Sequence, residues 1–166
     1  SIIASEPVRL RHSLETFHGK QDPKAVETAW PHLSSTDRYI RAAARTALEH
    51  QPLGEWQEKA LSETNITAQL EALLALTRRT GVCATHREAN HIVNTTARDA
   101  ILAALLKHDF AKLTNEQKLG YVRLIEIVLH RIGNPDDATV AAIIAKLDPA
   151  YPADNFELNW LLTETL

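Results

Sequence analysis

A short pattern recurs along this 166-residue chain at intervals of 28 and 29 residues. Each copy starts with Asp or Asn, continues with a small or aliphatic residue next to a polar Arg or Gln, and ends on a pair of apolar residues at helical spacing. A weaker fourth copy begins at Asp137. The three clear copies are Asp37, Ile40, Arg41, Ala44, Ala47, Leu48; Asn65, Ala68, Gln69, Ala72, Ala75, Leu76; and Asn94, Ala97, Arg98, Ile101, Ala104, Leu105.

A repeat of this length restricts the folds open to the chain. One pair of helices cannot bury its apolar faces alone, so a second pair must stack on it, and alanine at the contact lets the helices approach closely. The Asx residue at each start can accept hydrogen bonds from free backbone N–H groups. Alanine and leucine dominate the composition and only 5 glycines occur, which also favours helices. We therefore predict an all-α fold, an α-solenoid of about 9–10 stacked antiparallel helices forming one domain over residues 1–166.

Capping residues and helix breakers place these helices along the chain. Ser35 or Thr36 is predicted to cap one helix, and Thr114 with Gln117 has the spacing of a capping box. Pro31 should kink or end the helix that contains it. The predicted helices are 6–18, 23–33, 36–50, 53–62, 66–79, 84–92, 96–107, 115–131, 137–147 and 155–165.

Charge and hydropathy exclude several classes of protein. The net charge is -3, whereas nucleic-acid-binding domains usually carry a basic surplus. The longest apolar run, residues 100–106, is far shorter than the roughly 20 residues of a membrane span. Cys83 is the only cysteine, so the chain can form neither an internal disulfide nor a Cys-based zinc site, and we expect a small, semi-buried thiol. The chain contains no methionine, and we expect it to be a fragment of a larger protein.

Residues 22–50 resemble a HEAT-type repeat, in which a first helix is followed by a second helix with the pattern D-x-x-(V/I)-R-x-x-A-x-x-A-L. The segment reads DPKAVETAWPHLSSTDRYIRAAARTALEH. In that family the Asp and Arg form a ladder along the stack, and the second copy here departs from it because it has amides instead. The resemblance implies a structural ladder made by Asp37, Arg41, Asn65, Gln69, Asn94 and Arg98.

A narrower resemblance covers most of the chain. It rests on the segments RYIRAAARTALEHQPLGEWQEKAL, LTNEQKLGYVRLIEIVLHRIG and FELNWLLTETL, which are similar to the HEAT-like region of large exported bacterial proteins. Those proteins join a dehydrogenase-like propeller, a helical repeat region and a c-type cytochrome domain. The haem signature C-x-x-C-H is absent here, so the resemblance places haem and catalysis outside these residues. It implies a periplasmic or exported location.

The eight histidines raise the question of a metal site. His86, Glu88 and His91 form H-x-E-x-x-H, but the two histidines would lie about 140° apart around a helix, unlike the i, i+4 pair of a zincin. A polar loop or frayed helix is the preferred interpretation. The sequence also lacks a nucleophile elbow, a phosphate-binding loop and a dinucleotide-binding glycine pattern. We therefore predict no catalytic, cofactor-binding or metal-binding residues.

Basic and aromatic side chains offer candidates for partner binding. In HEAT arrays the second helices line the concave side, so the arginines and lysine on these helices are predicted to form a basic groove for a protein partner. The alternative is that their stems cover alanine-rich helices and their charges pair within the chain. Trp30, Trp56 and Trp160 are predicted to pack in the core or between repeats, with an exposed position at an interface as the alternative. The candidate groove residues are Arg38, Arg45, Arg78, Arg79, Arg98 and Lys107.

These observations predict a non-catalytic scaffold that docks or spaces domains, with a protein surface or neighbouring domains of the parent chain as its partner. A HEAT-like nucleic-acid-binding protein, or a relative of the helical-repeat DNA glycosylases, is the alternative. A metal-dependent helical enzyme is a third hypothesis.

Overall fold

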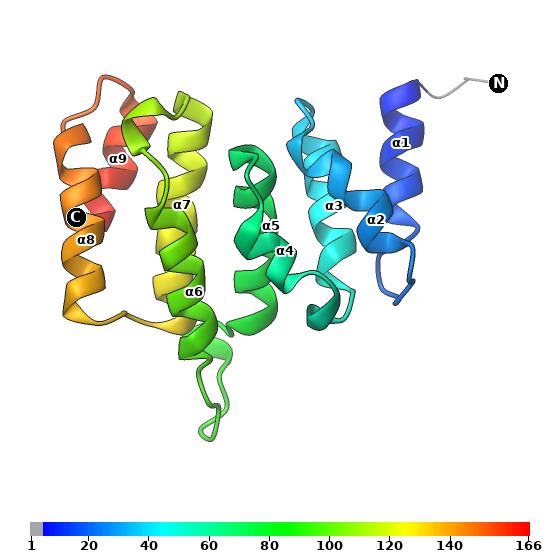
Figure 1. Cartoon of the computed structure of the whole chain (residues 1–166), viewed down its shortest axis with the longest axis horizontal. Coiled ribbons are helices and arrows are strands. Elements are labelled where there is room, and N and C mark those ends of the chain that lie inside the picture. The colour runs from blue at the N-terminus through cyan, green and yellow to red at the C-terminus, as the bar shows by residue number, and fades with distance from the viewer. Residues whose placement is uncertain (1–4) are drawn as a thin grey trace. The chain divides into compact units, whose positions relative to one another are not determined.

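The computed structural model describes residues 5–166 and is all-α, with no strand among those residues (Figure 1). Short 3₁₀ turns complete several of the connections between helices. The nine α-helices of this part of the chain are α1 (Glu6–Glu15), α2 (Ala25–Ala29), α3 (Arg38–Glu49), α4 (Gln57–Ser62), α5 (Ile66–Thr80), α6 (Thr95–Leu106), α7 (Asn115–Ile132), α8 (Asp137–Leu147) and α9 (Phe156–Thr165).

The chain divides into two compact units, one ending at Arg79 and the other beginning at Thr80. The N-terminal unit contains α1 to α5 and the C-terminal unit α6 to α9. The single domain predicted over residues 1–166 stays a prediction, and the two units are described separately. Residues 5–166 contain no helix with the length and hydropathy needed to cross a bilayer.

In the N-terminal unit, α3 packs against α1 and α2. The side chains of Leu14, Leu33 and Leu48 are fully buried there. Gln51, also fully buried, links the end of α3 to the connection before α2. Its Nε2 donates to the carbonyl of Lys20 at 3.1 Å, and its Oε1 accepts the N–H of Asp22 in the same connection at 2.9 Å. This polar contact is internal, so it fixes the path of the chain without leaving a buried group unpaired.

Pro31 ends α2, as the sequence predicts. The helix stops at Ala29 and the chain continues as a 3₁₀ turn over Trp30–Ser34, because a proline ring cannot occupy the interior of an α-helix without losing a hydrogen bond. The Trp30 indole is 7% exposed, and its Nε1 donates to Oε2 of Glu63 at 2.7 Å.

Glu63 collects several hydrogen bonds at the start of α5. Burial acts to raise its pKa, but the N–H of Asn65, the indole of Trp30 and the N–H of Thr64 stabilise the carboxylate more strongly. The pKa of Glu63 therefore lies below its ordinary value.

In the C-terminal unit, α7 packs against α6 and α9, and α8 packs against α6. Tyr121 of α7 is fully buried and its hydroxyl donates to the carbonyl of Leu105 at 3.0 Å. Phe110 contacts the Tyr121 ring edge-on, with the ring centroids 5.3 Å apart. The core of this unit is thus centred on α7.

The repeat pattern corresponds to equivalent positions in three helices. Asp37, Asn65 and Asn94 each accept a hydrogen bond from a backbone N–H in the first turn of α3, α5 and α6. The last three apolar positions of every copy are at most 3% exposed. This list comprises Ala44, Ala47, Leu48, Ala72, Ala75, Leu76, Ile101, Ala104 and Leu105.

Two predicted capping positions are wrong by one or two residues, although the predicted helix 137–147 has the bounds of α8. Asp37, not Ser35 or Thr36, caps α3, and Ser35 instead accepts the N–H of Asp37 through its hydroxyl. The fourth copy is also displaced, because Asp136 caps α8 and Asp137 lies inside the helix. Several Asx and hydroxyl residues stand side by side at both places, and pattern alone does not choose between neighbours.

The predicted capping box at Thr114 is confirmed. The Thr114 hydroxyl accepts from the N–H of Gln117, and the Gln117 side chain accepts from the N–H of Thr114. At the other end α7 stops before Gly133, whose φ of 108° suits glycine.

The helix predicted over residues 84–92 is wrong. Only a 3₁₀ turn, Ala84–His86, forms there, and the rest of the segment has no helical structure. Ile92 is 90% exposed, so the segment has no apolar stripe to bury. A short helix without such packing is marginal in water.

Candidate functional site

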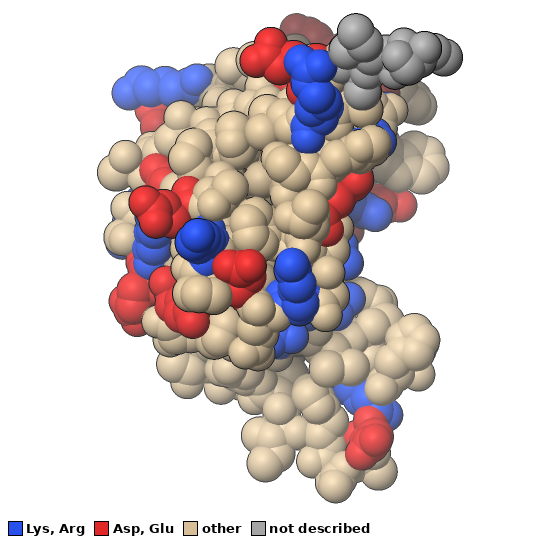
Figure 2. All heavy atoms as spheres, turned by 90° about the vertical axis from the view of Figure 1, so that its right-hand side faces the viewer, with Lys and Arg blue, Asp and Glu red and all other residues tan. Residues whose placement is uncertain are grey.

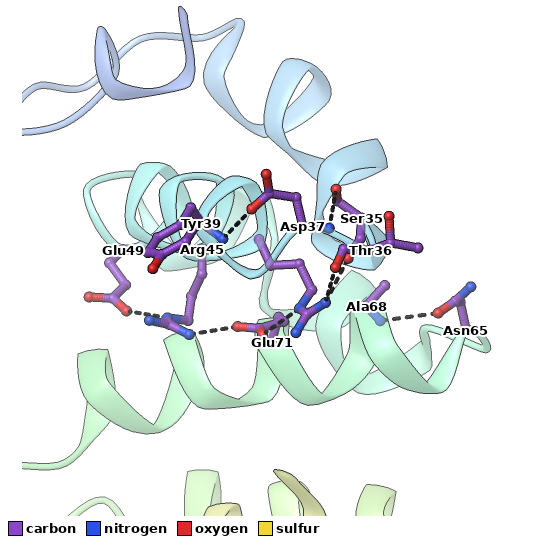
Figure 3. A network of polar contacts seen from close by, with 10 residues as sticks. Ser35, Thr36, Asp37, Tyr39, Arg45, Glu49, Asn65, Ala68 and Glu71 are labelled. Carbon is purple, nitrogen blue, oxygen red and sulfur yellow. Dashed lines mark hydrogen bonds and ion pairs between the residues drawn. The ribbon is translucent and has the colours of Figure 1, made fainter. Parts of the chain in front are cut away.

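Five charged side chains meet where α3 faces α5 in the N-terminal unit. Figure 3 shows Arg45, Glu49 and Glu71 of this network. Oε2 of Glu71 lies 2.6 Å from Nη1 of Arg45, and its Oε1 lies 3.4 Å from Nε of Arg41. Oε1 of Glu49 lies 3.6 Å from Nε of Arg45 and 3.2 Å from Nε of Arg78. Because Glu71 is on α5 and accepts two arginines from α3, this network holds the two helices in register.

This network is partly buried. The side chains of Arg41, Arg45, Glu49 and Glu71 are between 11 and 19% exposed, while that of Arg78 is 49% exposed. Ion pairs at this depth are screened less by salt than surface pairs, and removal of one partner leaves the other charge partly desolvated. The network therefore has mainly a structural role.

Arg41 and Gln69, which are equivalent in the first two copies of the repeat, both donate to a backbone carbonyl. Nη1 of Arg41 donates to the carbonyl of Ser35 at 2.8 Å, and Nε2 of Gln69 donates to the carbonyl of Leu61 at 3.4 Å. Both side chains therefore turn back to the chain segment that precedes their own helix. An amide replaces a guanidinium at the second copy because either can donate to a carbonyl.

Arg98, the third residue of this set, turns in another direction. Its Nη1 donates to the carbonyl of Asn134 at 2.7 Å, and its Nε pairs with Asp99 at 2.8 Å. It therefore ties α6 to the connection between α7 and α8. The Asx members of the predicted ladder cap their own helices, and a continuous ladder from copy to copy stays a prediction.

The residues predicted to line a basic groove fall into two groups. Arg45, Arg78 and Arg98 have acidic partners within their own units. Arg38, Arg79 and Lys107 are exposed, and the Arg38 guanidinium lies 4.8 Å from the centroid of the Tyr39 ring. The geometry fits the alternative of intramolecular pairing for the first group.

Charges of both signs are interspersed on the side of the molecule drawn in Figure 2, which carries α1. On that side basic residues do not gather into one area (Figure 2). Binding of a partner by the basic side chains stays a prediction.

The histidine motif does not form a compact group of ligands. His86 ends the 3₁₀ turn, and the N–H of His91 donates to the carbonyl of Glu88 at 3.0 Å, which makes a tight backbone turn. Across residues 5–166, no three His, Cys, Asp or Glu side chains are placed to hold a metal ion together.

The C-terminal unit carries an aromatic surface in which Trp160 takes the exposed position that the sequence left open as its alternative, while sequence reasoning missed Phe156. Phe156 and Trp160 lie four residues apart on α9 and are 78% and 59% exposed. With Leu119, Gly120 and Leu161 they line a hollow of about 500 Å³, which we name the α7–α9 groove. Arg123 of α7 and Glu157 of α9 complete its lining and give it one charge of each sign.

The core position predicted for the tryptophans is confirmed for two of the three. Trp30 and Trp56 are 7% and 1% exposed, whereas Trp160 is exposed. A signal for this exists in the sequence of α9. Leu158 and Leu162 are buried on one side of the helix, and the aromatic pair is offset from them by about 200°, so one neighbouring helix cannot cover both sides.

Comparison of the chain with protein-family models, with curated proteins and with solved structures gives no match. Inferences about its role therefore rest on the residues and their geometry.

Proposed function

We propose that the chain is a segment of a HEAT-like α-solenoid that serves as a protein-interaction scaffold and has no catalytic role of its own. The parent would be a large exported protein of the kind that joins a propeller to a c-type cytochrome domain. The repeat supports the solenoid, since its Asx residues cap three helices and its apolar positions are buried in all three copies.

The α7–α9 groove is the observation that carries the interaction role. Exposed phenylalanine and tryptophan side chains on one helix face are unusual on a surface with no partner, and aromatic residues dominate the binding energy of many interfaces. Gly120 has no side chain, which permits close approach of a ligand at that point of the lining.

The occupant that we propose is the apolar face of an amphipathic helix from a protein partner. The lining comes from two helices and is mainly apolar, the arrangement that receives a third helix in helix-in-groove binding. Arg123 and Glu157 can pair with charges of opposite sign beside the partner's apolar stripe, which would set its direction.

A library of amphipathic helical peptides displayed on yeast tests this proposal. Selection on the wild-type chain should enrich peptides that bind the Phe156→Ala/Trp160→Ala variant at least about tenfold more weakly, the loss typical of aromatic hot spots. The matched control is Val140→Ala/Ile144→Ala, because these residues are also exposed, apolar and four residues apart on one helix, α8. The control should bind the same peptides within about twofold, as expected for residues outside the contact.

Equal binding of the selected peptides to the wild type and to the α9 variant would contradict the proposal. So would a selection that yields no helical binder. A gel-shift experiment with duplex DNA at low salt separates the alternative, since tight binding there would favour a nucleic-acid-binding role.

A further inference from the structure

The single cysteine of the chain faces an imidazole from a distant helix. Sγ of Cys83, between α5 and α6, lies 3.1 Å from Nε2 of His130, which is 47 residues further along the chain. Oγ1 of Thr85 lies 3.1 Å from the same sulfur and 3.3 Å from Nδ1 of His86. Three polar side chains from two parts of the C-terminal unit thus gather around one thiol.

Two arginines fix this cluster in place. Arg87 donates through Nε to the carbonyl of Val82 at 2.9 Å and through Nη2 to the carbonyl of Arg131 at 2.7 Å. Arg131 in turn donates to the carbonyl of Gly81 at 3.0 Å. Since Arg131 directly follows His130, these bonds join the cysteine segment to the turn of α7 that carries the imidazole.

The surroundings of the thiol favour its ionised form. Hydrogen bonds from Thr85, and then from His130 and His86, lower the pKa of Cys83 to about 6, against a small opposing effect of burial. The guanidinium groups of Arg87 and Arg131 also lie next to this segment. A thiolate is the nucleophilic form of cysteine, and this one is partly exposed.

We propose that Cys83 is a site of reversible modification by small-molecule disulfides, with His130 and Thr85 holding its sulfur ready for attack. The Cys83 thiolate attacks one sulfur of the disulfide, the S–S bond of the reagent breaks, and a new S–S bond joins Cys83 to half of it. The other half leaves as a thiolate and takes a proton from the solvent. The disulfide is the oxidant, and each modified cysteine releases one reduced thiol.

The composition adds a consequence for the lifetime of the product. No second cysteine occurs in these 166 residues, so no thiol within them can displace the attached group. The mixed disulfide therefore persists until a thiol from outside these residues attacks it. This inference does not depend on the proposed scaffold role, because the α7–α9 groove and the Cys83 cluster have no residue in common.

The test is the rate at which an aromatic disulfide, 5,5′-dithiobis(2-nitrobenzoic acid), releases its coloured thiol at pH 5.5. At this pH a thiol with a pKa of about 6 is roughly two-hundredfold more ionised than an ordinary thiol. The lower intrinsic nucleophilicity of such a thiolate removes about tenfold of this advantage. The folded chain should therefore react about twentyfold faster than the same chain unfolded in urea.

Variants show whether the fast reaction of Cys83 depends on the side chains around its sulfur or only on its exposure. His130→Ala should lower the rate at pH 5.5 by about threefold or more and move the midpoint of the rate–pH curve upward, since it removes one donor to the thiolate. Thr85→Val should do the same and provides a second measurement if one variant unfolds. His12→Ala, an exposed histidine on α1, should leave the rate unchanged.

The proposal would be overturned if the rate–pH curve of the folded wild type had its midpoint in the ordinary pKa range of thiols. An unchanged rate in folded His130→Ala and Thr85→Val would overturn it too. Cys83→Ser gives the background, because it removes the only thiol.

Discussion

The α3–α5 contact and the α7–α9 groove are both formed by pairs of helices. The side chains of the first are paired with one another, whereas the aromatic side chains of the second are left exposed. Between α3 and α5, Glu71 pairs with Arg41 and Arg45, and Glu49 pairs with Arg45 and with Arg78 of α5. On α9, Phe156 and Trp160 are more than half exposed. Charged residues in one region therefore serve the fold, while apolar residues in the other remain exposed.

This difference reverses the usual expectation that charges mark binding surfaces and aromatic residues mark cores. Residue type alone is therefore a weaker guide to a side chain's role than whether a neighbouring group pairs with it or covers it. Substitutions in the first region should change stability, and substitutions in the second should change binding with little effect on stability.

Glu71→Ala should have the largest effect on stability. It removes the shared acceptor of Arg41 and Arg45 and leaves two partly buried guanidinium groups without it, so we expect a loss of about 2–3 kcal/mol, below the value for a fully buried pair. Urea unfolding followed by circular dichroism measures this. Glu27→Ala on α2, an exposed carboxylate, is the control, and an equal loss in both variants would show that the network does not hold α3 to α5.

Replacement of the helix caps should have the next largest effect. Asp37→Ala, Asn65→Ala and Asn94→Ala should each lower the free energy of unfolding by about 1 kcal/mol, the usual contribution of an N-cap side chain. The variant Asp137→Ala should have a smaller effect, since Asp136 caps α8. If Asp137→Ala lowered the free energy of unfolding more than Asp136→Ala, then Asp137 would be the cap, as the fourth copy of the repeat predicts.

Acid should weaken the contact between Glu63 and Trp30. Because the folded state lowers the pKa of Glu63, the carboxylate contributes stability above its unfolded pKa of about 4.3. This contribution is lost as the pH falls through the lower folded value. Wild type should therefore be more stable than Glu63→Gln near neutral pH, and the difference should shrink in acid. A difference that does not depend on pH would show that the charge has no part in it.

The smallest effect on stability is expected for Phe156→Ala/Trp160→Ala. Exposed apolar side chains lose little packing on truncation, so the change should stay within about 0.5 kcal/mol of wild type. Thermal melts compare this variant with Val140→Ala/Ile144→Ala. A loss of several times this size would mean that the aromatic pair stabilises α9 within the unit, which would weaken the contrast with the α3–α5 contact.

Much of the helical structure could be predicted from the sequence because its signals are local. The capping box at Thr114, the stop before Gly133 and the break at Pro31 depend on residues within one turn of each other. The Asx caps of the repeat are also local, since a cap bonds to a backbone N–H two or three residues away, but where several capping residues stand side by side, as at Asp37 and Asp136, the sequence did not choose between them. The prediction of a helix over residues 84–92 was wrong because these residues permit a helix, but a helix of this length also needs an apolar face packed against another element.

The candidate sites depended on contacts between residues far apart in the chain. Arg45 and Glu71 are 26 residues apart and Cys83 and His130 are 47 apart, and single-sequence patterns carry no information on which distant side chains meet. The exposure of Trp160 was decided in the same way, because α9 has apolar residues on two sides and only the packing against α7 determines which side is buried.

The sequence by itself thus determined an all-α chain, most helix boundaries and the buried positions of its three clear repeats. Hydrogen bonds within one helical turn and the 3.6-residue period are sufficient for that. Only the tertiary structure decided which arginines are neutralised, which thiol faces an imidazole and which aromatic residues remain exposed. Those outcomes depend on distances between side chains that are brought together by folding.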